Sequence, residues 1–466
     1  MHKSFLLLGL MLGVMAGSVY SFGWSVAGLG LTFGFGLWSA SRLDRGSGRI
    51  LVSVAVIFFG MTLGLARTSW SAASWRSEML AASAVVTATQ WTGVVVAEPM
   101  HGDQSLRLLV RPSSLRSLIL VTVPRARDWH YGDRVEIVGG KKLELNDPAR
   151  RRSYGVNFSE VRFLSSGHGW AWRAKLISVK HFFLQRLNAN LPQPAAALAA
   201  GLAVGAKQSL GAEWSEKFRR TGLSHIVVLS GYNLTLIGNW LGRAFGFLPA
   251  AFGIVLFALL ADASAATARA AIMALIVLTA RLTGRLYQAG PALGLAATVM
   301  VLWNPWLLVS DLGFQLSVLA TAGLIYLAPV LEKKLVGRWL WLPVRWGVRD
   351  IFITTVATQL AVFPLLLYQT NQISLAAVIT NVLILPTIPL AMVLGFGASV
   401  NVITAALAYP ILGYQLAVVK WFADLPLAAL EVKSFPVWAA AVIYGFIILW
   451  FYHEHARQNL SRFTGR

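Results

Sequence analysis

Residues 375–399 read LAAVITNVLILPTIPLAMVLGFGAS and contain no charged side chain. A helix that crosses a hydrocarbon core of roughly 30 Å needs about 20 apolar residues, so this stretch is predicted to span a membrane. Pro386 and Pro389 lie inside it, and proline lacks the N–H that a continuous helix uses. We therefore expect these prolines, and likewise Pro364 and Ser230-Gly231 in other spans, to interrupt helices, which is tolerated where the freed backbone lines a cavity or finds protein partners.

Stretches of the same kind occur along most of the chain. Of its residues, 56% are hydrophobic and 13% are charged, whereas a soluble domain is roughly 45–50% apolar. Its 18 tryptophans, many beside the ends of these stretches, fit the aromatic belts of membrane surfaces. With residues 375–399 the expected spans number about twelve, the others being 4–20, 22–40, 50–66, 226–242, 247–261, 264–280, 290–304, 311–331, 351–369, 402–422 and 437–452.

The basic loops give the orientation of these spans. When three spans are followed by nine, every basic loop falls on one side, namely 41–49, Arg243, 281–285, 333–349 and the tail from 457. Because basic loops stay in the cytoplasm, we expect both termini to be cytoplasmic. The chain is then a multi-pass protein of a bacterial inner membrane, with its first helix uncleaved.

Residues 67–165 differ from the rest, because short runs of alternating apolar and polar residues stand between turn residues. Such alternation is typical of β-strands. Five strands, which suit a small OB-type barrel, are expected at 91–96, 106–110, 118–123, 133–138 and 156–163. The predicted fold is a polytopic α-helical membrane protein with an inserted all-β OB-like domain. Its parts are N-terminal transmembrane helices (1–66), the extracytoplasmic β domain (67–165), an interfacial amphipathic helix (166–190) and a polytopic membrane domain (191–466).

Catalytic and metal chemistry find little support in the sequence. The chain has no cysteine, which excludes disulfides and cysteine-ligated metals, and it shows no metal-ligand cluster, Walker loop or nucleotide-binding glycine motif. Ser224 or Ser230 with His225 and Asp262 or Asp311 offers the residue types of a hydrolase triad, but spacing alone cannot bring them together. We expect no enzymatic activity, no metal and no cofactor.

The most specific stretch is FRRTGLSHIVVLSGYN at residues 218–233. It resembles the signature of the ComEC family, the DNA channels of natural transformation, whose competence domain opens with Thr-Gly-Leu-Ser-His and a following Ser-Gly. The resemblance continues in the same order through the rest of the chain, in Ala268–Met273 with Gly284-Arg285, Trp303-Asn304-Pro305 with Gly313–Ser317, and Gln359 with Pro364, Asn381, Pro386 and Pro389.

Two departures from the family pattern matter. Tyr232-Asn233 stands where the family usually has Leu-His, which puts any role of that second histidine in doubt. Full-length members commonly add a metallo-β-lactamase-like domain, thought to degrade the strand that is not transported. The resemblance is to a short form without this domain, because we expect His453-Glu454-His455 not to restore its motif. The resemblance therefore implies a separate nuclease, together with an external DNA receptor and a cytosolic motor.

A DNA path through an apolar block needs polar side chains and a few cations within or beside the spans. Arg269 is the strongest candidate for function, the alternative being a pair with Asp262 or Asp311. Any single polar residue is as readily explained by a bond to a neighbouring helix. The predicted translocation path consists of Thr221, Gly222, Ser224, His225, Ser230, Gly231, Asn233, Arg269, Gln315, Ser317, Gln359, Pro364, Asn381 and Pro386.

The β domain offers a second set of candidates, in which aromatic rings would stack on bases and arginines would follow phosphates. The predicted DNA-binding residues are Trp91, Arg107, Arg125, Arg127, Trp129, Tyr131 and Arg134. The competing interpretation is that the aromatic residues form the core of the barrel.

The function predicted from all of this is an inner-membrane channel that passes single-stranded DNA into the cytoplasm. Two alternatives stay open, a transporter of another polyanion or small solute on the same scaffold and a membrane-embedded hydrolase. The sequence also leaves open whether the path lies within one subunit or between subunits of an oligomer.

Overall fold

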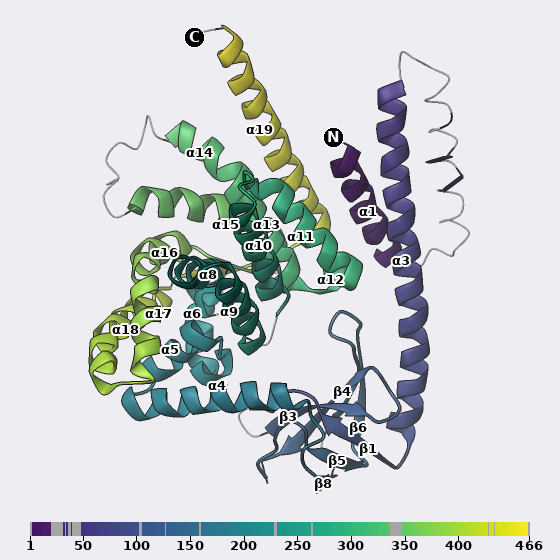
Figure 1. The fold of residues 1–466 in the computed structure, drawn as a ribbon, viewed down its shortest axis with the longest axis vertical. Helices are drawn as coiled ribbons and strands as arrows, with labels where there is room; N and C mark the ends of the chain where they lie inside the picture. Colours follow the sequence, from purple (N-terminus) through teal and green to yellow (C-terminus); the bar gives the residue numbers. More distant parts are fainter. Residues whose placement is uncertain are drawn as a thin grey trace. The chain divides into compact units, whose positions relative to one another are not determined.

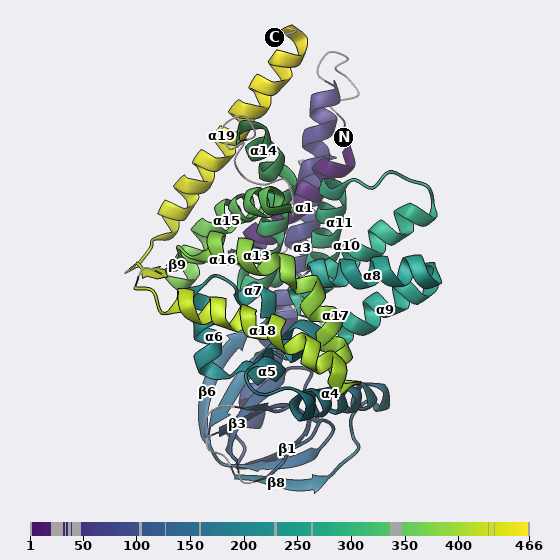
Figure 2. The same cartoon turned by 90° about the vertical axis from the view of Figure 1, so that its left-hand side faces the viewer.

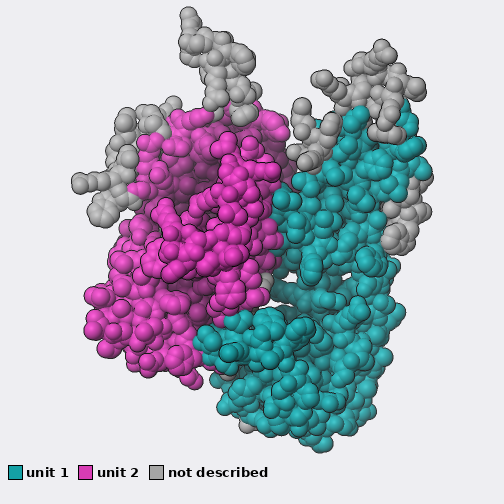
Figure 3. Space-filling view, viewed as in Figure 1, with its two compact units in different colours: residues 1–180, 294–312 teal, residues 181–293, 313–466 magenta. Residues whose placement is uncertain are grey.

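A long helix organises the amino-terminal part of the computed structural model. The structure describes residues 2–464 except 20–30, 33, 36–38, 40–47, 102–104, 126, 158–159, 228–230, 262–263, 336–346, 427 and 433. The chain forms two units, residues 1–180 with 294–312 and residues 181–293 with 313–466 (Figure 3). Most of the described elements are helices, and one large sheet lies in the first unit (Figure 1).

Helices α1 (His2–Val19) and α3 (Gly48–Thr87) pack against each other through glycines. A Cβ atom added to Gly9 or Gly13 would lie 2.0 Å from the backbone oxygen of Ile57 or Met61. Gly64 approaches α1 in the same way, with the carbonyl oxygen of Leu10 2.4 Å from its Cβ position. Small residues at a helix interface let two backbones approach closely, a packing mode common in membranes.

Helix α3 does not end at residue 66, where the sequence predicted the end of a span and the start of the β domain. It continues to Thr87 and contains 40 residues, which corresponds to about 60 Å of helix, roughly twice a hydrocarbon core. Residues 67–87 contain five alanines and no glycine or proline, so no helix breaker ends the helix after hydrophobicity falls. The first strand starts only at Gln90.

The sheet contains eight strands, three more than predicted. They are β1 (Gln90–Val95), β2 (Met100–His101), β3 (Ser105–Pro112), β4 (Leu118–Pro124), β5 (Arg134–Val138), β6 (Lys141–Asp147), β7 (Arg152–Asn157) and β8 (Glu160–Ser165). The strand order is β6-β7-β4-β3-β1-β5-β8, with β2 beside β3. The strand expected at 156–163 is thus two strands, and β6 was missed because it lies at the edge and is largely exposed.

Strands β7 and β8 connect the two ends of the central run β4-β3-β1-β5. β7 pairs with β4 in parallel, and β8 pairs with β5 in antiparallel orientation. Only two residues separate β7 from β8. The segment 152–165 therefore pairs with β4 at one end of the central run and with β5 at the other, and the sheet curls around its core (Figure 2). Alternate residues of β1, β3 and β4 point into that core, where Val86 of α3 joins them. An OB-like barrel remains a prediction.

Helix α4 (Ala171–Asn190) follows the sheet, where an amphipathic interfacial helix was predicted. Lys180, Phe183 and Leu187 are buried, while Val179 and Phe182 on another side are exposed. The apolar residues therefore occupy more than one face, unlike the single apolar face of a helix that lies on a membrane. The interfacial position of this helix stays a prediction.

The second unit consists almost entirely of helices. Helix α5 is buried along its whole length and lies at the centre of the largest apolar cluster. Residues 294–312, with most of α11 and all of α12, belong to the first unit.

The elements from α5 to the end of the chain are α5 (Ala195–Val204), η1 (Lys207–Leu210), α6 (Gly211–Arg220), α7 (Ser224–Val227), α8 (Gly231–Phe245), α9 (Phe247–Leu260), α10 (Ala265–Leu282), α11 (Ala289–Trp303), α12 (Leu307–Ser310), α13 (Leu312–Ala322), η2 (Gly323–Leu327), α14 (Ala328–Leu335), α15 (Val348–Thr370), β9 (Gln372–Ser374), α16 (Ala377–Ile384), η4 (Leu385–Thr387), α17 (Ile388–Ala398), α18 (Val402–Ala423), β10 (Ala429–Glu431) and α19 (Val437–Thr464).

Seven helical stretches among the described residues are long and apolar enough to cross a membrane. They are Val52–Thr87, Ala265–Leu282, Leu312–Leu335, Val348–Thr370, Ala377–Ala398, Val402–Ala423 and Val437–Glu454. Four shorter apolar helices accompany them, Phe5–Ser18, Ala195–Val204, Phe247–Leu260 and Ala289–Trp303. The protein is therefore built as a polytopic membrane protein. The count of twelve remains a prediction, and most of the span expected at 22–40 lies outside the described residues.

Candidate functional site

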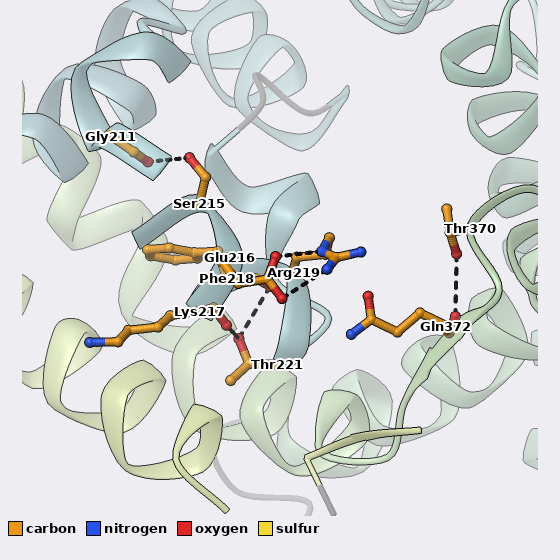
Figure 4. Close-up of polar contacts among 9 residues, drawn as sticks. All are labelled: Gly211, Ser215, Glu216, Lys217, Phe218, Arg219, Thr221, Thr370 and Gln372. Atoms are coloured by element: carbon orange, nitrogen blue, oxygen red, sulfur yellow. Dashed lines mark hydrogen bonds and ion pairs between the residues drawn. The ribbon is translucent and has the colours of Figure 1, made fainter. Parts of the chain in front are cut away.

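Thr221 is the C-terminal cap of helix α6, and its polar groups form hydrogen bonds there. Its hydroxyl donates to the carbonyl oxygens of Lys217 at 2.9 Å and Phe218 at 3.2 Å (Figure 4). Its own carbonyl oxygen accepts a hydrogen bond from the Thr380 hydroxyl at 2.9 Å. Thr221 is completely buried. Although the sequence placed it on the path, its contacts are those of a residue that holds α6 against α16.

Gly222 follows Thr221 in the turn between α6 and α7. Its φ of +71° lies in the left-handed region, which glycine adopts without strain. A Cβ atom there would also lie 2.5 Å from the Cβ of Ala377. The Ser374 hydroxyl bonds the Arg220 carbonyl oxygen at 2.7 Å, so the corner is fixed to β9 as well. We define residues 220–223 as the signature corner.

The solvent side of α6 carries paired charges. Arg219 donates two hydrogen bonds to the carboxylate of Glu216, at 2.7 and 2.8 Å (Figure 4). These bonds hold the pKa of Glu216 below its usual value. Lys217 bonds Glu213 at 2.6 Å in the same way. Ion pairs between neighbouring turns on an exposed helix face contribute little to stability, so this face is a solvated surface.

The residues after the corner are only partly placed. Ser224 and His225 are exposed on the short helix α7, where the His225 Nδ1 lies 3.1 Å from the Gly222 carbonyl oxygen. Ser230 lies outside the described residues. Gly231 and Asn233 form the first turn of α8, and the direction of the Asn233 side chain is not described.

Arg269 and Ser317, both predicted for the path, meet in the structure. The Arg269 Nε donates to the Ser317 hydroxyl at 2.8 Å, and its Nη1 approaches the sulfur of Met273 at 3.2 Å. Arg269 is 8% exposed. Neither a hydroxyl nor a thioether carries the negative charge that would compensate the guanidinium, and burying a cation among membrane helices is costly.

The two acidic partners proposed for Arg269 are not seen with it. Asp262 lies outside the described residues. Asp311 belongs to the first unit, where its carboxylate lies 3.8 Å from the Nε of Arg150. A pair between Arg269 and Asp262 therefore stays a prediction.

Gln315, Gln359 and Pro364 lie on two neighbouring helical segments. Gln315 precedes Ser317 by two residues on α13, so the two side chains leave the helix on different faces. Gln359 and the buried Pro364 belong to α15, which continues through Pro364 to Thr370, so the helix interruption predicted at Pro364 is wrong. The segment η2, a π-helix in line with α13, approaches α15 closely, since a Cβ on Gly323 would lie 2.6 Å from the Cβ of Ala361. π-helical turns occur frequently at functional sites.

The predicted break at Pro386 is confirmed, because η4 interrupts the helix between α16 and α17. Asn381, one turn before the break, is 3% exposed, and its Oδ1 has no hydrogen-bond partner among the described residues. Gln415 of α18 donates to the Thr387 hydroxyl in the break at 2.7 Å, and its Oε1 also lacks a partner there. Gln415 was not among the residues predicted for the translocation path, although a glutamine inside an apolar span indicates such a position.

The predicted DNA-binding residues of the β domain differ in their exposure. Trp91 and Trp129 are buried in the sheet core, so neither ring offers an open face to a base, and that part of the prediction is wrong. The Tyr131 hydroxyl accepts a hydrogen bond from the backbone N–H of Trp170 at 3.0 Å. The Arg127 guanidinium lies 4.0 Å from the centre of the Phe163 ring. Arg107, Arg125, Arg127 and Arg134 are all exposed.

These features define a multi-pass membrane protein whose helical block contains a buried cation, a broken helix and buried oxygens that have no hydrogen-bond partner in the described part of the chain. Comparison with known proteins gives its family. A model described as "Competence protein" matches residues 202–457, more than half of the chain, so the chain belongs to the competence protein family.

One curated relative agrees with this assignment. The chain is 22% identical over 253 residues to ComE operon protein 3 of Bacillus subtilis (strain 168), a match that covers 52% of this chain and 31% of the relative. The chain thus aligns with less than a third of that protein. No solved structure matches. The β domain at 90–165 precedes the region matched by the family model.

Proposed function

We propose that this protein passes DNA through the bacterial inner membrane during transformation, as a single strand that moves into the cytoplasm. The observation that carries the proposal is the match of the competence family model to residues 202–457, the region in which Arg269 lies buried among apolar helices. A polyanion in a low-dielectric passage needs fixed positive charge, and Arg269 supplies it without a compensating acid among its observed partners.

The oxygens of Asn381 and Gln415 and the helix break between them support a route that is polar for part of its length. A buried polar atom without a hydrogen-bond partner lowers the stability of the fold by about 1–3 kcal/mol. Such an atom is therefore a candidate for a functional role. Arg269 and Asn381 are buried, so the proposed route is closed at these residues and opens when DNA passes.

The remaining parts of the proposal concern orientation and partners. Twelve spans place both termini in the cytoplasm and the OB-like domain outside, where Arg107, Arg125, Arg127 and Arg134 would contact phosphates. The chain transports without cleaving DNA. An external receptor, a separate nuclease and a cytosolic motor would act with it.

A deletion strain tests the proposal. Wild-type protein should restore the arrival of labelled DNA in the cytosol, and Arg269→Gln should lower it by about tenfold or more, the effect of ~1.4 kcal/mol on a barrier. Arg281→Gln is the matched control, because Arg281 lies on the same helix but is exposed and bonded to Asn239 at 2.8 Å. Normal DNA uptake in the deletion strain would overturn the assignment.

A further inference from the structure

The arginine run at residues 150–152 belongs neither to the predicted path nor to the predicted DNA-binding residues. It lies in the turn between β6 and β7, where the Arg150 N–H donates to the Asp147 carboxylate at 3.2 Å. Arg151 has a φ of +55°, which residues other than glycine rarely adopt. Its carbonyl oxygen accepts a hydrogen bond from the Leu118 N–H at 2.7 Å, which helps to fix this conformation. We define residues 149–152 as the arginine tip.

The charges of the arginine tip are only partly balanced. Arg150 and Arg151 are exposed, and the carboxylate of Asp311 lies 3.8 Å from the Nε of Arg150. Arg152 is half-buried, and its Nε has no hydrogen-bond partner among the described residues. Burial and the positive charge of Arg150 lower the pKa of Arg152, and Asp147 opposes them. The two guanidinium groups therefore repel each other, and an anion bound by both would relieve that repulsion.

A further contact attaches the arginine tip to the end of α11. The Asn304 Nδ2 donates to the Ala149 carbonyl oxygen at 2.8 Å. Arg67 of α3 donates to the carbonyl oxygens of Leu302 at 2.8 Å and Trp303 at 2.9 Å. All of these residues belong to the first unit. The arginine tip, the end of α11 and the middle of α3 therefore lie close together.

This part of the first unit has the features of a membrane surface. The span predicted at 50–66 ends directly before Arg67. Trp70, one turn further along α3, is 65% exposed, and Trp303 at the end of α11 is 87% exposed. Exposed tryptophans at the ends of apolar helices are typical of the layer in which lipid headgroups meet water. Headgroup phosphates in this layer come within reach of the arginine tip.

We propose that the arginine tip binds the phosphate groups of anionic phospholipids, in the leaflet on the side of the β domain. Guanidinium groups bind phosphate through paired N–H donors, and the exposed rings of Trp70 and Trp303 lie in the same interfacial layer. The bound lipid holds the end of the β6–β7 hairpin at the membrane surface. The attachment of the tip to the end of a membrane span favours a lipid over a DNA strand. This inference does not rest on the proposed function.

Lipid binding by the full-length protein tests the inference. Purified protein in detergent is titrated with phosphatidylglycerol or phosphatidylcholine, and bound lipids are counted by native mass spectrometry. Wild type should bind phosphatidylglycerol in preference to phosphatidylcholine. Arg150→Gln with Arg151→Gln should weaken binding of phosphatidylglycerol about tenfold or more, because each basic residue near an anionic lipid surface contributes roughly fivefold in affinity.

Lys141→Gln with Lys142→Gln is the matched control. Both lysines are exposed and lie at the opposite end of β6, so the control removes the same charge from the same hairpin. Trp75 of α3 donates to the Asn146 side chain at 3.0 Å, so β6 runs from the tip along α3, away from Arg67. The control should bind phosphatidylglycerol like wild type, and equal losses in the two variants would overturn the inference. A tip variant that keeps the lipid but loses binding of a single-stranded oligonucleotide would make the tip a DNA site instead.

A measurement of position does not depend on how the charge variants fold. Single-cysteine proteins can be labelled specifically, because the chain has no cysteine of its own. The labelled proteins are placed in vesicles of phosphatidylcholine and phosphatidylglycerol that contain a lipid with a nitroxide on its headgroup. A fluorophore on Arg151→Cys should be quenched, and one on Lys142→Cys should be quenched much less. Absent quenching at residue 151, or equal quenching at both positions, would contradict the proposal.

Discussion

The signature corner and the interior around Arg269 belong to the same unit but differ in how their polar groups are satisfied. In the corner, the hydroxyl and the carbonyl of Thr221 each have a partner at 2.9 Å. Among the described residues, by contrast, the hydrogen-bond partners of the Arg269 side chain are a hydroxyl and a thioether, and the Asn381 Oδ1 has none. The signature corner therefore stabilises the fold. The groups suited to transport are Arg269 and Asn381, whose hydrogen-bonding and charge requirements the described contacts meet only in part.

The largest expected effect comes from breaking the corner. Gly222→Ala places a Cβ 2.5 Å from Ala377 at a φ of +71°, so strain and overpacking together should lower the free energy of unfolding by about 2–5 kcal/mol. Gly284→Ala is the control, because its φ is +63° but nothing lies within 4 Å of its Cβ position. It should cost about 1 kcal/mol. Thermal unfolding in detergent measures both, and equal losses would show that close packing at Gly222 is unimportant.

A smaller effect, of opposite sign, is expected in the interior. Asn381→Leu removes a buried oxygen without a partner and should raise the free energy of unfolding by about 1–2 kcal/mol while DNA uptake falls. Thr380→Val is the neighbouring control. It removes the bond to the Thr221 carbonyl oxygen and should lower stability by about 1–2 kcal/mol. A less stable Asn381→Leu protein with normal uptake would mean that Asn381 serves only the fold.

The smallest effect concerns the charged face of α6. The bonds from Arg219 hold the pKa of Glu216 below its unfolded value, so the pair contributes stability above about pH 4.3, the ordinary glutamate pKa. That contribution is lost as the pH falls through the lower pKa of the folded protein. Because the pair is exposed, it should amount to no more than ~0.5 kcal/mol. The unfolding free energies of wild type and Glu216→Gln, compared at pH 7 and pH 3, should converge at the lower pH. A constant difference would exclude this linkage.

Composition and spacing predicted the long helices well, because membrane spans depend on local hydrophobicity. The span expected at 402–422 is Val402–Ala423, and the break at Pro386 follows from the missing N–H of proline. The end of α3 was mispredicted because a helix can leave the hydrocarbon without a change of backbone geometry, and residues 67–87 contain no glycine or proline to end it. Trp91 and Trp129 show a related limit, since a strand pattern does not tell a core ring from a surface ring.

The candidate site was predicted as a set of residues but not as an arrangement. Arg269 and Ser317 are 48 positions apart, and only the packing of α10 with α13 brings their side chains together. The unsatisfied oxygen of Asn381 and the contact of Gln415 with Thr387 likewise depend on which helices become neighbours. The bond from Asn304 to Ala149 crosses 155 positions, and no periodicity in the sequence encodes it.

Thiol labelling tests most directly whether the interior around Arg269, rather than the signature corner, opens to DNA. Single-cysteine proteins carrying Ser317→Cys or Thr221→Cys are treated with a membrane-impermeant thiol reagent, with and without DNA uptake in progress. The account predicts that Ser317→Cys is labelled only while DNA is being taken up and that Thr221→Cys is never labelled. An unlabelled Ser317→Cys protein that still imports DNA would contradict it.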